Sequence, residues 1–346
     1  MRRRLFLSAL TPGLALRSQP FYPDKADLLY WLDSAGRRQP VRKIEDWNRR
    51  RSHILANIEK VMGPLPAPYT GPLEVDVTEE ERTHSFVRRK ITFIPEPGDR
   101  AHAYLFLPLA KGRRPAMLCL HQTTRIGKAE PAGLGGKPNL HYARELAQRG
   151  VIALAPDYPN FGDYVFDPYA NGYASASMKG IVNHRRAVDL LLSLPNTNPK
   201  RIGVIGHSLG GHNALFVATF DTRIRAVVTS CGFNSFYKYM KGNLKGWSHK
   251  GYMPRIADLY HAHPAEMPFD FTEILGAIAP RAVFINAPTG DTNFEVSGVH
   301  DCVEAARPVY RLYGKSSLLR AVHPDCGHDF PPEIRRQAYA FLDSAW

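Results

Sequence analysis

Short apolar runs alternate along the chain with longer stretches of helical periodicity. The apolar runs have the length of buried strands, and the stretches between them are compatible with amphipathic helices. Strands that alternate with helices in this way build a parallel sheet that is covered on both faces. The pattern therefore predicts an α/β fold with a mostly parallel central sheet. The six strand-like runs are residues 115–120, 151–155, 201–205, 224–230, 281–287 and 318–322.

Before this alternating region, three segments place apolar residues at every second position: residues 73–77, 87–93 and 103–107. This alternation is typical of strands with one solvated face, so we expect antiparallel strands at one edge of the sheet. The 346 residues show no break in composition and no internal repeat, which excludes solenoids and propellers. We expect an N-terminal helical extension and first edge strand over residues 21–84, followed by one main domain over residues 85–346.

A sharp turn around Ser208 is the most specific local pattern. Residues 206–210 read Gly-His-Ser-Leu-Gly, and they follow the apolar run 201–205 and precede a helix-compatible run at 211–216. At such a strand-turn-helix the serine projects from the top of the sheet. Small residues are needed on both sides of it because strand and helix nearly touch. The motif alone also occurs in ordinary Gly-rich turns, so the flanking strand and helix carry the prediction that Ser208 is a nucleophile.

A serine hydroxyl needs a general base to take its proton and an acid to orient that base. Downstream of Ser208, Asp291 comes just after the fifth apolar run, and His328 lies in the loop after the sixth. The order Ser, Asp, His is the one expected for this type of turn. We predict Ser208, Asp291 and His328 as the catalytic residues, with Asp301 as the main alternative acid.

Acyl transfer passes through an oxyanion, which needs preorganised N–H donors. The backbone N–H of Leu209 starts the helix after the serine, where the helix dipole favours negative charge. The loop after the first apolar run supplies the second predicted donor, Gln122, and we place its neighbour His121 at the substrate-binding pocket. His207 and His212 cannot easily reach back to the serine, so we interpret them as packing or pocket-wall residues.

Together these motifs resemble the α/β-hydrolase superfamily. The resemblance is carried by the loop after the first apolar run, Ala-Pro-Asp-Tyr at 155–158, the elbow serine and Cys-Gly-His-Asp-Phe at 326–330. Residues 85–346 are most similar to the acetylxylan-esterase-like and dienelactone-hydrolase-like bacterial esterases. Dienelactone hydrolases use a cysteine nucleophile, so Ser208 favours an esterase. The resemblance implies a serine-dependent carboxylic ester hydrolase that acts through an acyl-enzyme on an esterified carbohydrate such as acetylated xylan.

Two other functions stay open. A prolyl-oligopeptidase-like serine peptidase would share the catalytic order, but the roughly 85 residues before the core are too few for the gating propeller of that family. A non-catalytic binding protein could keep the hydrolase fold, but the intact order of Ser, Asp and His argues against it. For the esterase that the resemblance implies, the expected partner is a small-molecule or polysaccharide ester substrate.

An insertion at about residues 232–275 is rich in aromatic residues set among lysines and arginines. We expect most of these aromatic residues to pack in the interior. The insertion follows a strand at the edge that carries Ser208, so part of it is expected to form a cap over the substrate, where aromatic faces suit sugar rings. Trp247 and Tyr252 are the predicted substrate-binding residues of this cap.

Charge and cysteine spacing exclude several functions. The net charge of +13 comes from basic residues spread along the chain, which is typical of solvated faces and not of a nucleic-acid interface. The four cysteines show no Cys-x-x-Cys or Cys/His spacing, so we expect no metal site and no cofactor. A disulfide between Cys302 and Cys326 is an alternative in an exported protein.

The Gly-rich stretch 132–138 invites a comparison with a phosphate-binding loop. Pro131 occupies the position of the first glycine of such a loop, and Pro138 occupies the position of the Ser/Thr that holds magnesium. We therefore expect no nucleotide site there.

The N-terminus has the pattern of an export signal. Three arginines at positions 2 to 4 precede a short apolar stretch, and Arg-Arg-Leu-Phe-Leu at 3–7 is similar to a twin-arginine signal. A disordered basic tail on a cytoplasmic protein is the alternative. No stretch reaches the ~18 apolar residues of a membrane-spanning helix. We expect a signal over residues 1–20, a periplasmic or extracellular location and no stable membrane insertion.

Overall fold

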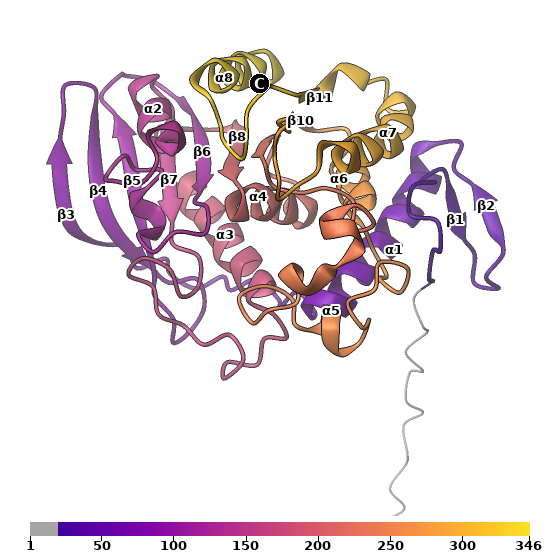
Figure 1. Cartoon of the computed structure of the whole chain (residues 1–346). Helices are drawn as coiled ribbons and strands as arrows, with labels where there is room; N and C mark the ends of the chain where they lie inside the picture. Colours follow the sequence, from indigo (N-terminus) through magenta and orange to yellow (C-terminus); the bar gives the residue numbers. More distant parts are fainter. Residues whose placement is uncertain (1–19) are drawn as a thin grey trace, which may run out of the picture.

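The computed structural model describes residues 20–346, so the predicted export signal lies outside the described residues except for Pro20. A nine-stranded sheet in the order β11-β10-β9-β8-β6-β7-β5-β4-β3 forms the centre of the described chain (Figure 1). The six strands β6 to β11 run parallel to one another, whereas β3, β4 and β5 are antiparallel to their neighbours. The strands are β3 (Asp76–Arg82), β4 (Phe86–Phe93), β5 (Ala101–Pro108), β6 (Arg114–Leu120), β7 (Ile152–Pro156), β8 (Thr197–His207), β9 (Ala226–Ser230), β10 (Ala282–Asn286) and β11 (Leu319–Val322).

The six apolar runs all form parallel strands, so this part of the prediction is confirmed. The first edge strand begins later than predicted: β3 spans Asp76–Arg82, so that only Asp76 and Val77 of the alternating segment 73–77 pair with β4. Every residue of β3 is exposed, and its glutamates form a ladder of ion pairs with the basic residues of β4. The cross-strand charges therefore decided the register, where the hydrophobic alternation pointed three residues too early.

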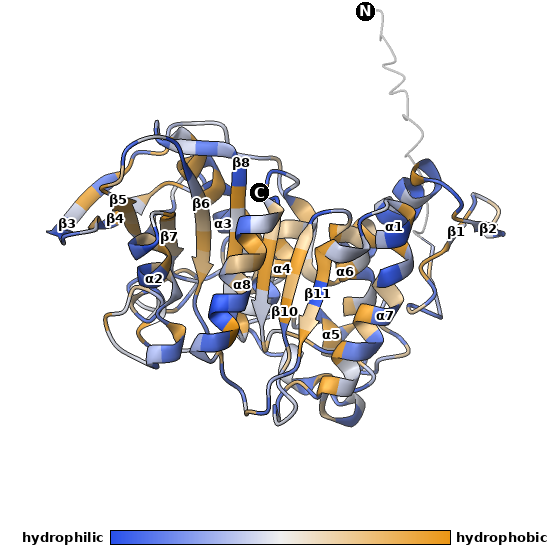
Figure 2. Cartoon of the chain, turned by 90° about the horizontal axis from the view of Figure 1, so that it is seen from above, coloured by the Kyte–Doolittle hydropathy of each residue, from blue (hydrophilic) through white to orange (hydrophobic). Residues whose placement is uncertain are grey.

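Helices cover both faces of the sheet. On one face, α2 and α8 pack Tyr142 and Phe341 against inward-facing residues such as Ile205. The neighbouring residue Val204 points to the other face, where α1, α3, α4, α6 and α7 pack. Figure 2 shows the central strands coloured mainly hydrophobic, as burial on both faces requires. The helices are α1 (Ile44–Met62), α2 (Tyr142–Gln148), α3 (Ala176–Ser193), α4 (Leu209–Phe220), α5 (Arg255–Asp258), α6 (Phe271–Ile278), α7 (Val296–Leu312) and α8 (Pro332–Ala345).

The strand order reverses next to β6. This strand pairs with β7 on one side and with β8 on the other. After β6 the chain continues to β7 on one side, whereas after β8 it continues to β9 on the opposite side. Ligands of open α/β sheets bind in the crevice at such a switch point. The loops that carry Gln122 and Ser208 follow β6 and β8, and the fold therefore places both predicted functional loops at this crevice.

The N-terminal extension adds a small antiparallel sheet of β1 (Tyr30–Leu32) and β2 (Arg38–Pro40), followed by α1. It lies at the opposite end of the molecule from β3 (Figures 1 and 2). The insertion between β9 and α6 contains α5 and two short 3-10 turns, η3 (Tyr239–Gly242) and η4 (Leu244–Trp247). Within residues 20–346, no helix combines the length and the apolar character needed to cross a bilayer.

Candidate active site

Ser208 stands between the end of β8 and the start of α4 with φ 53° and ψ −116°. A non-glycine residue with positive φ is strained by about 1–3 kcal/mol and persists only where its surroundings impose it. Here the Ser208 N–H donates to the Ser230 carbonyl at 2.8 Å, and the Ser208 carbonyl accepts from Gly211 N–H at 2.9 Å. The turn is thus held in the conformation that exposes a nucleophile at the end of a strand.

The glycines around Ser208 are required by close backbone contacts. A Cβ on Gly206 would lie 2.2 Å from the Gly210 carbonyl oxygen, and a Cβ on Gly210 would lie 1.9 Å from the Leu120 carbonyl oxygen. Neither distance is compatible with any side chain, and the second contact joins the turn to the end of β6. The near-contact of strand and helix that the sequence pattern implied is therefore present.

His328 and Asp291 meet at the same edge of the sheet. His328 Nδ1 lies 2.9 Å from Asp291 Oδ2 and 3.1 Å from Oδ1. The Asp291 side chain is 1% exposed, and its Oδ1 also accepts from the backbone N–H groups of Asn293 and Phe294. Burial opposes ionisation, but the hydrogen bonds from His328 and the two N–H groups hold the pKa of Asp291 below its ordinary value. An ionised carboxylate at Nδ1 leaves Nε2 of His328 as the proton acceptor.

The alternative acid, Asp301, lies exposed on α7, so the carboxylate that contacts His328 is Asp291. The His328 ring packs edge-on against His207, with ring centroids 4.7 Å apart. Since His207 directly precedes Ser208, this contact places the imidazole of His328 beside the turn. Three residues far apart in the sequence, Ser208, Asp291 and His328, are thereby assembled at one place.

His207 and His212 are buried packing residues, as their position in the turn suggested. His207 is fully buried, its Nδ1 lies 2.9 Å from Ser230 Oγ, and burial lowers its pKa well below the ordinary value. His212 packs against the rings of Trp247 and Tyr252, and burial lowers its pKa to about 3. Both rings are neutral near pH 7, so they act as polar packing groups and not as charges.

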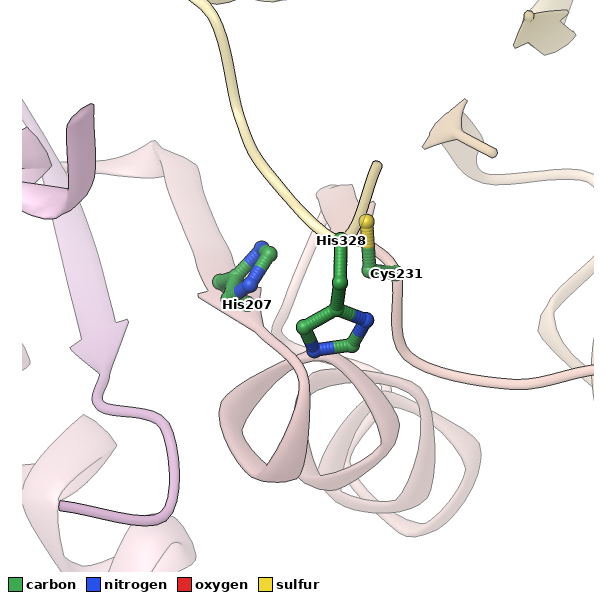
Figure 3. A group of neighbouring side chains, drawn as sticks. All are labelled: His207, Cys231 and His328. Carbon is green, nitrogen blue, oxygen red and sulfur yellow. The ribbon is translucent and has the colours of Figure 1, made fainter. Parts of the chain in front are cut away.

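Cys231 is a neighbour of the site that the sequence motifs missed. Figure 3 shows Cys231, His207 and His328 converging, and one potential ligand atom of each lies within 4.8 Å of the others. Cys231 Sγ contacts the Asp329 carbonyl oxygen at 3.4 Å, and burial raises the pKa of the thiol well above its ordinary value. A buried thiol that contacts a backbone carbonyl oxygen fits a packing role. We keep the prediction that the reaction needs no metal.

The two predicted oxyanion donors follow the carboxyl ends of the neighbouring parallel strands β8 and β6. Leu209 is the first residue of α4, where backbone N–H groups have no acceptor within the helix. Gln122 follows β6, and its side-chain Nε2 donates to Glu130 Oε1 at 2.9 Å. Because that amide is engaged, the group that Gln122 can offer to an oxyanion is its backbone N–H.

His121 does not have the environment of a substrate-binding residue. It is 2% exposed, and its Nε2 accepts a hydrogen bond from the Tyr158 N–H at 3.0 Å. Its Nδ1 must then carry the proton, which it donates to the Gln122 carbonyl oxygen at 2.6 Å. Both ring nitrogens are occupied by backbone groups. The prediction that His121 binds substrate is therefore wrong, and the residue instead holds the loop after β6 in place.

The two predicted cap residues, Trp247 and Tyr252, differ in how far their side chains are buried. Trp247 is 2% exposed and packs against Tyr239 and Phe271 in the interior, so its predicted contact with substrate is wrong. The indole ring is buried because it packs against the other aromatic side chains of the insertion, so it is not presented to the crevice. Tyr252 is half-buried, and its hydroxyl lies 3.3 Å from Thr123 Oγ1 in the loop after β6, so its role in substrate binding stays a prediction.

The alternative disulfide is absent between the two described residues. Cys302 is a buried free thiol on α7, and Cys326 is a partly exposed free thiol in the loop that carries His328. Burial raises the pKa of Cys302 well above its ordinary value, so this thiol is an inert packing group.

Comparisons with known proteins find similarity to hydrolases and esterases. A family model described as glucuronyl esterase, fungi, matches residues 166–314. The Bacillus subtilis (strain 168) protein YtaP, which is named as a hydrolase, is 28% identical over 298 residues, or 82% of this chain and 95% of YtaP. The 4-O-methyl-glucuronoyl methylesterase of Phanerochaete carnosa is 24% identical over 348 aligned residues, with 88% of this chain and 77% of that protein covered.

Two solved structures extend the comparison. A glucuronoyl esterase from Solibacter usitatus superposes with a TM-score of 0.74 at 19% identity, covering 95% of this chain and 99% of its own. Acetyl xylan esterase 1 from Thermoanaerobacterium sp. JW/SL YS485 gives a TM-score of 0.58 at 17% identity, covering 84% and 98%. Likeness at this identity shows the fold, and the predicted α/β-hydrolase fold is confirmed.

Proposed function

We propose that this chain, which has the α/β-hydrolase fold, is a serine-dependent carboxylic ester hydrolase that works through an acyl-enzyme. The observation that carries the proposal is the contact between His328 and the buried Asp291 at 2.9 Å, beside the strained Ser208. A histidine oriented by a carboxylate next to an exposed serine is the arrangement that activates a hydroxyl nucleophile. The esterase names of the matching family and of the similar structures support the same reaction class.

In this proposal each residue has a step. Ser208 Oγ attacks the ester carbonyl carbon while His328 Nε2 takes the hydroxyl proton, and Asp291 stabilises the resulting imidazolium. The backbone N–H groups of Leu209 and Gln122 hold the negative oxygen of the tetrahedral intermediate. His328 then gives its proton to the departing alcohol. A water molecule, activated by the same histidine, attacks the acyl-enzyme and releases the carboxylic acid and the free serine.

The substrate that we propose is an acylated or alkyl-esterified carbohydrate, with acetylated xylan as the first candidate. Similar proteins named as acetyl xylan esterase and as glucuronoyl methylesterase support this class. The insertion at 232–275 would form one wall of the pocket, since Tyr252 reaches the loop after β6. A Tyr252→Phe variant should raise KM for a sugar ester and leave the hydrolysis of a small aryl acetate unchanged.

Replacement of Ser208 by alanine tests the proposal. The variant should lose about 10⁵-fold or more in kcat on aryl acetates, acetylated xylan or methyl glucuronate esters, with an unchanged circular dichroism spectrum. Ser316→Ala, at an exposed serine far along the chain, is the matched control and should keep full activity. Retained activity in folded Ser208→Ala would refute the mechanism. Faster turnover of an aminoacyl-anilide would favour a peptidase, and binding of sugar without turnover would favour a binding protein.

We also propose that the enzyme is exported, on the strength of the arginine pair and apolar stretch in residues 1–20. A reporter protein fused to these residues should reach the periplasm of a host with a twin-arginine system. Replacing Arg3 and Arg4 by lysine should retain the reporter in the cytoplasm. A reporter that stays inside with the native arginines would contradict this route.

A further inference from the structure

The Gly-rich stretch 132–138, which has no role as a phosphate loop, lies between the two loops that carry the reaction. Two residues before it lies Glu130, which is 2% exposed. The backbone before Glu130 is anchored, because Lys128 donates to Asp157 through both its N–H at 2.7 Å and its Nζ at 2.6 Å. Asp157 directly follows β7. Glu130 is therefore placed by a rigid element next to the crevice at the carboxyl ends of β6 and β8.

The Glu130 carboxyl joins two segments through one oxygen. Its Oε1 accepts from Gln122 Nε2 at 2.9 Å and from the Lys137 N–H at 3.1 Å. Its Oε2 is buried and has no hydrogen-bond partner among the described residues. A buried carboxyl with one unpaired oxygen is costly for folding. Stability alone therefore does not account for a glutamate at this position.

The glycines of the stretch allow the chain to turn over this carboxyl. Gly136 has φ +72°, and a Cβ there would lie 2.4 Å from Glu130 Oε1. Only glycine satisfies both the backbone conformation and the close approach. This contact gives a physical reason for part of the Gly-rich motif.

The far end of the stretch is fixed beside the catalytic base. Asn139 Nδ2 donates to Asp329 Oδ2 at 2.6 Å, and Asp329 directly follows His328. The Asn139 carbonyl oxygen accepts from Arg335 Nη1 at 2.9 Å, and the same Nη1 donates to the Phe330 carbonyl oxygen at 2.6 Å. The segment from Glu130 to Asn139 thus links the loop of Gln122 to the loop of His328.

We propose that Glu130 is a positioning residue for the oxyanion site: it fixes the side chain of Gln122, and the Gly-rich segment transmits the position of the base loop to the same carboxyl. This inference rests on the proposed function. Gln122 is then held at two points, by Glu130 at its side chain and by His121 at its carbonyl oxygen. Its peptide N–H is oriented before substrate arrives, as an oxyanion donor must be.

The kinetic test compares two replacements of Glu130. Glu130→Met keeps the volume and removes both acceptors, whereas Glu130→Gln keeps one oxygen for the two donors and puts its NH₂ at the place of the unpaired oxygen. Loss of an entire oxyanion donor costs about 10²- to 10³-fold in kcat, so its misplacement in Glu130→Met should cost about tenfold with KM unchanged. Glu130→Gln should stay within about twofold of the native enzyme. An unchanged kcat in folded Glu130→Met would overturn the proposal.

Two further readouts separate positioning from general damage. An alkyl boronic acid, which binds serine as a tetrahedral adduct, should bind Glu130→Met about tenfold more weakly, in proportion to kcat/KM. In a Gln122→Met background, the change Glu130→Met should have almost no further effect, because the link is already broken. If Glu130→Met instead lowers kcat by the same factor in the native and in the Gln122→Met background, Glu130 does not act through Gln122.

Amide hydrogen exchange tests the proposal independently of activity. Peptides covering residues 121–124 should exchange faster in Glu130→Met than in the native protein and in Glu130→Gln, while peptides of the central strands should not change. Unchanged protection of residues 121–124 would refute the positioning role even if no ester is found to be a substrate. Absence of esterase activity in the native enzyme, with faster exchange in Glu130→Met, would refute only the proposed function.

Discussion

Two buried aspartates, Asp291 and Asp270, have similar backbone partners and opposite electrostatics. Asp291 accepts from the N–H groups of Asn293 and Phe294. Asp270 caps α6 by accepting from the Phe271 N–H, and it also accepts from the N–H of Phe236 in the insertion. The difference lies in the third neighbour. Asp291 meets His328, which can carry a positive charge, whereas Asp270 lies near the carboxyl of Glu273.

The pKa values follow from these neighbours. His328 and the two N–H groups hold the pKa of Asp291 below its ordinary value in spite of burial. Burial, which outweighs the two N–H groups and is reinforced by Glu273, raises the pKa of Asp270 to about 7. Asp291 is therefore an anion near neutral pH that can stabilise an imidazolium, and Asp270 is a cap that binds a proton near neutral pH. A carboxyl becomes catalytic here through its partner and not through its burial.

The surroundings of Asp270 form a structural ion cluster under the N-terminal extension. Arg50 on α1 donates to Glu273 on α6 at 2.7 Å, and both side chains are fully buried. The guanidinium also stacks 3.1 Å from the ring centroid of Tyr22. This cluster joins the extension to the main domain, whereas the Asp291 cluster joins loops that do chemistry. The two clusters should therefore respond differently to the same kind of mutation.

Among the changes that compare the two aspartate clusters, the largest effect is expected from Asp291→Asn. The amide keeps the shape of the carboxylate but cannot stabilise the imidazolium, so kcat should fall by about 10² to 10⁴. Steady-state kinetics on an aryl acetate measures the change, and binding of a non-hydrolysed substrate analogue should be retained. Asp301→Asn is the matched control because that carboxylate is exposed on α7. A comparable loss in Asp301→Asn would show that the acid has been assigned to the wrong loop.

The corresponding change in the structural cluster, Glu273→Gln, should affect stability and not turnover. It leaves Arg50 buried without its counter-charge, which costs about 3 kcal/mol in the free energy of unfolding. Urea titration at pH 7 measures this loss, and kcat at 25 °C should equal that of the native enzyme. Replacing Arg50 and Glu273 together by methionine should recover most of the stability. A fall in kcat without loss of stability would mean that this cluster is coupled to the active site.

The raised pKa of Asp270 predicts a specific pH dependence of stability. Well below pH 4 the carboxyl is protonated in both states. As the pH rises through about 4 the unfolded chain ionises, whereas the native state holds its proton to about pH 7. The free energy of unfolding should therefore fall between about pH 4 and pH 7. In Asp270→Asn this fall should be absent. At pH 8 the variant avoids the cost of ionising the buried carboxyl, which is roughly 4 kcal/mol, but its amide caps α6 more weakly. The free energy of unfolding of the variant should therefore exceed that of the native protein by about 2 kcal/mol at pH 8. Equal pH slopes for the two proteins, measured by urea titration, would contradict the assignment.

The smallest effect is expected from chelation. If Asp291, His328 and Ser208 carry the reaction without a metal, incubation with EDTA followed by assay in metal-free buffer should leave kcat/KM unchanged. The close approach of His207, Cys231 and His328 makes this a necessary measurement. Loss of rate on chelation, restored by zinc, would mean that these residues hold a metal-activated water.

The positions of the parallel strands along the chain and the order of Ser, Asp and His are written locally in the sequence. Each parallel strand is marked by its own apolar run, because a strand that is buried on both faces has apolar residues at nearly every position. Ser208 was marked by the glycines that backbone contact requires around it. Asp291 and His328 were marked by their places after strands, since parallel strands bring their carboxyl ends to one edge of the sheet.

What only the tertiary structure decided is which side chains face the site and which are buried beneath it. His121 and Trp247 have the composition of binding residues, yet packing against Tyr158 and Phe271 turns both inward. Glu130 and Cys231 carry no motif. The two partners of Glu130, Gln122 and Lys137, are near in sequence but meet it only through the fold of two loops, and Cys231 contacts Asp329, which lies far away in the sequence. Periodicity and turn chemistry act over a few residues and are legible in one chain segment. Side-chain partnership and ionisation are set by the packing of several segments, and only the assembled fold contains that information.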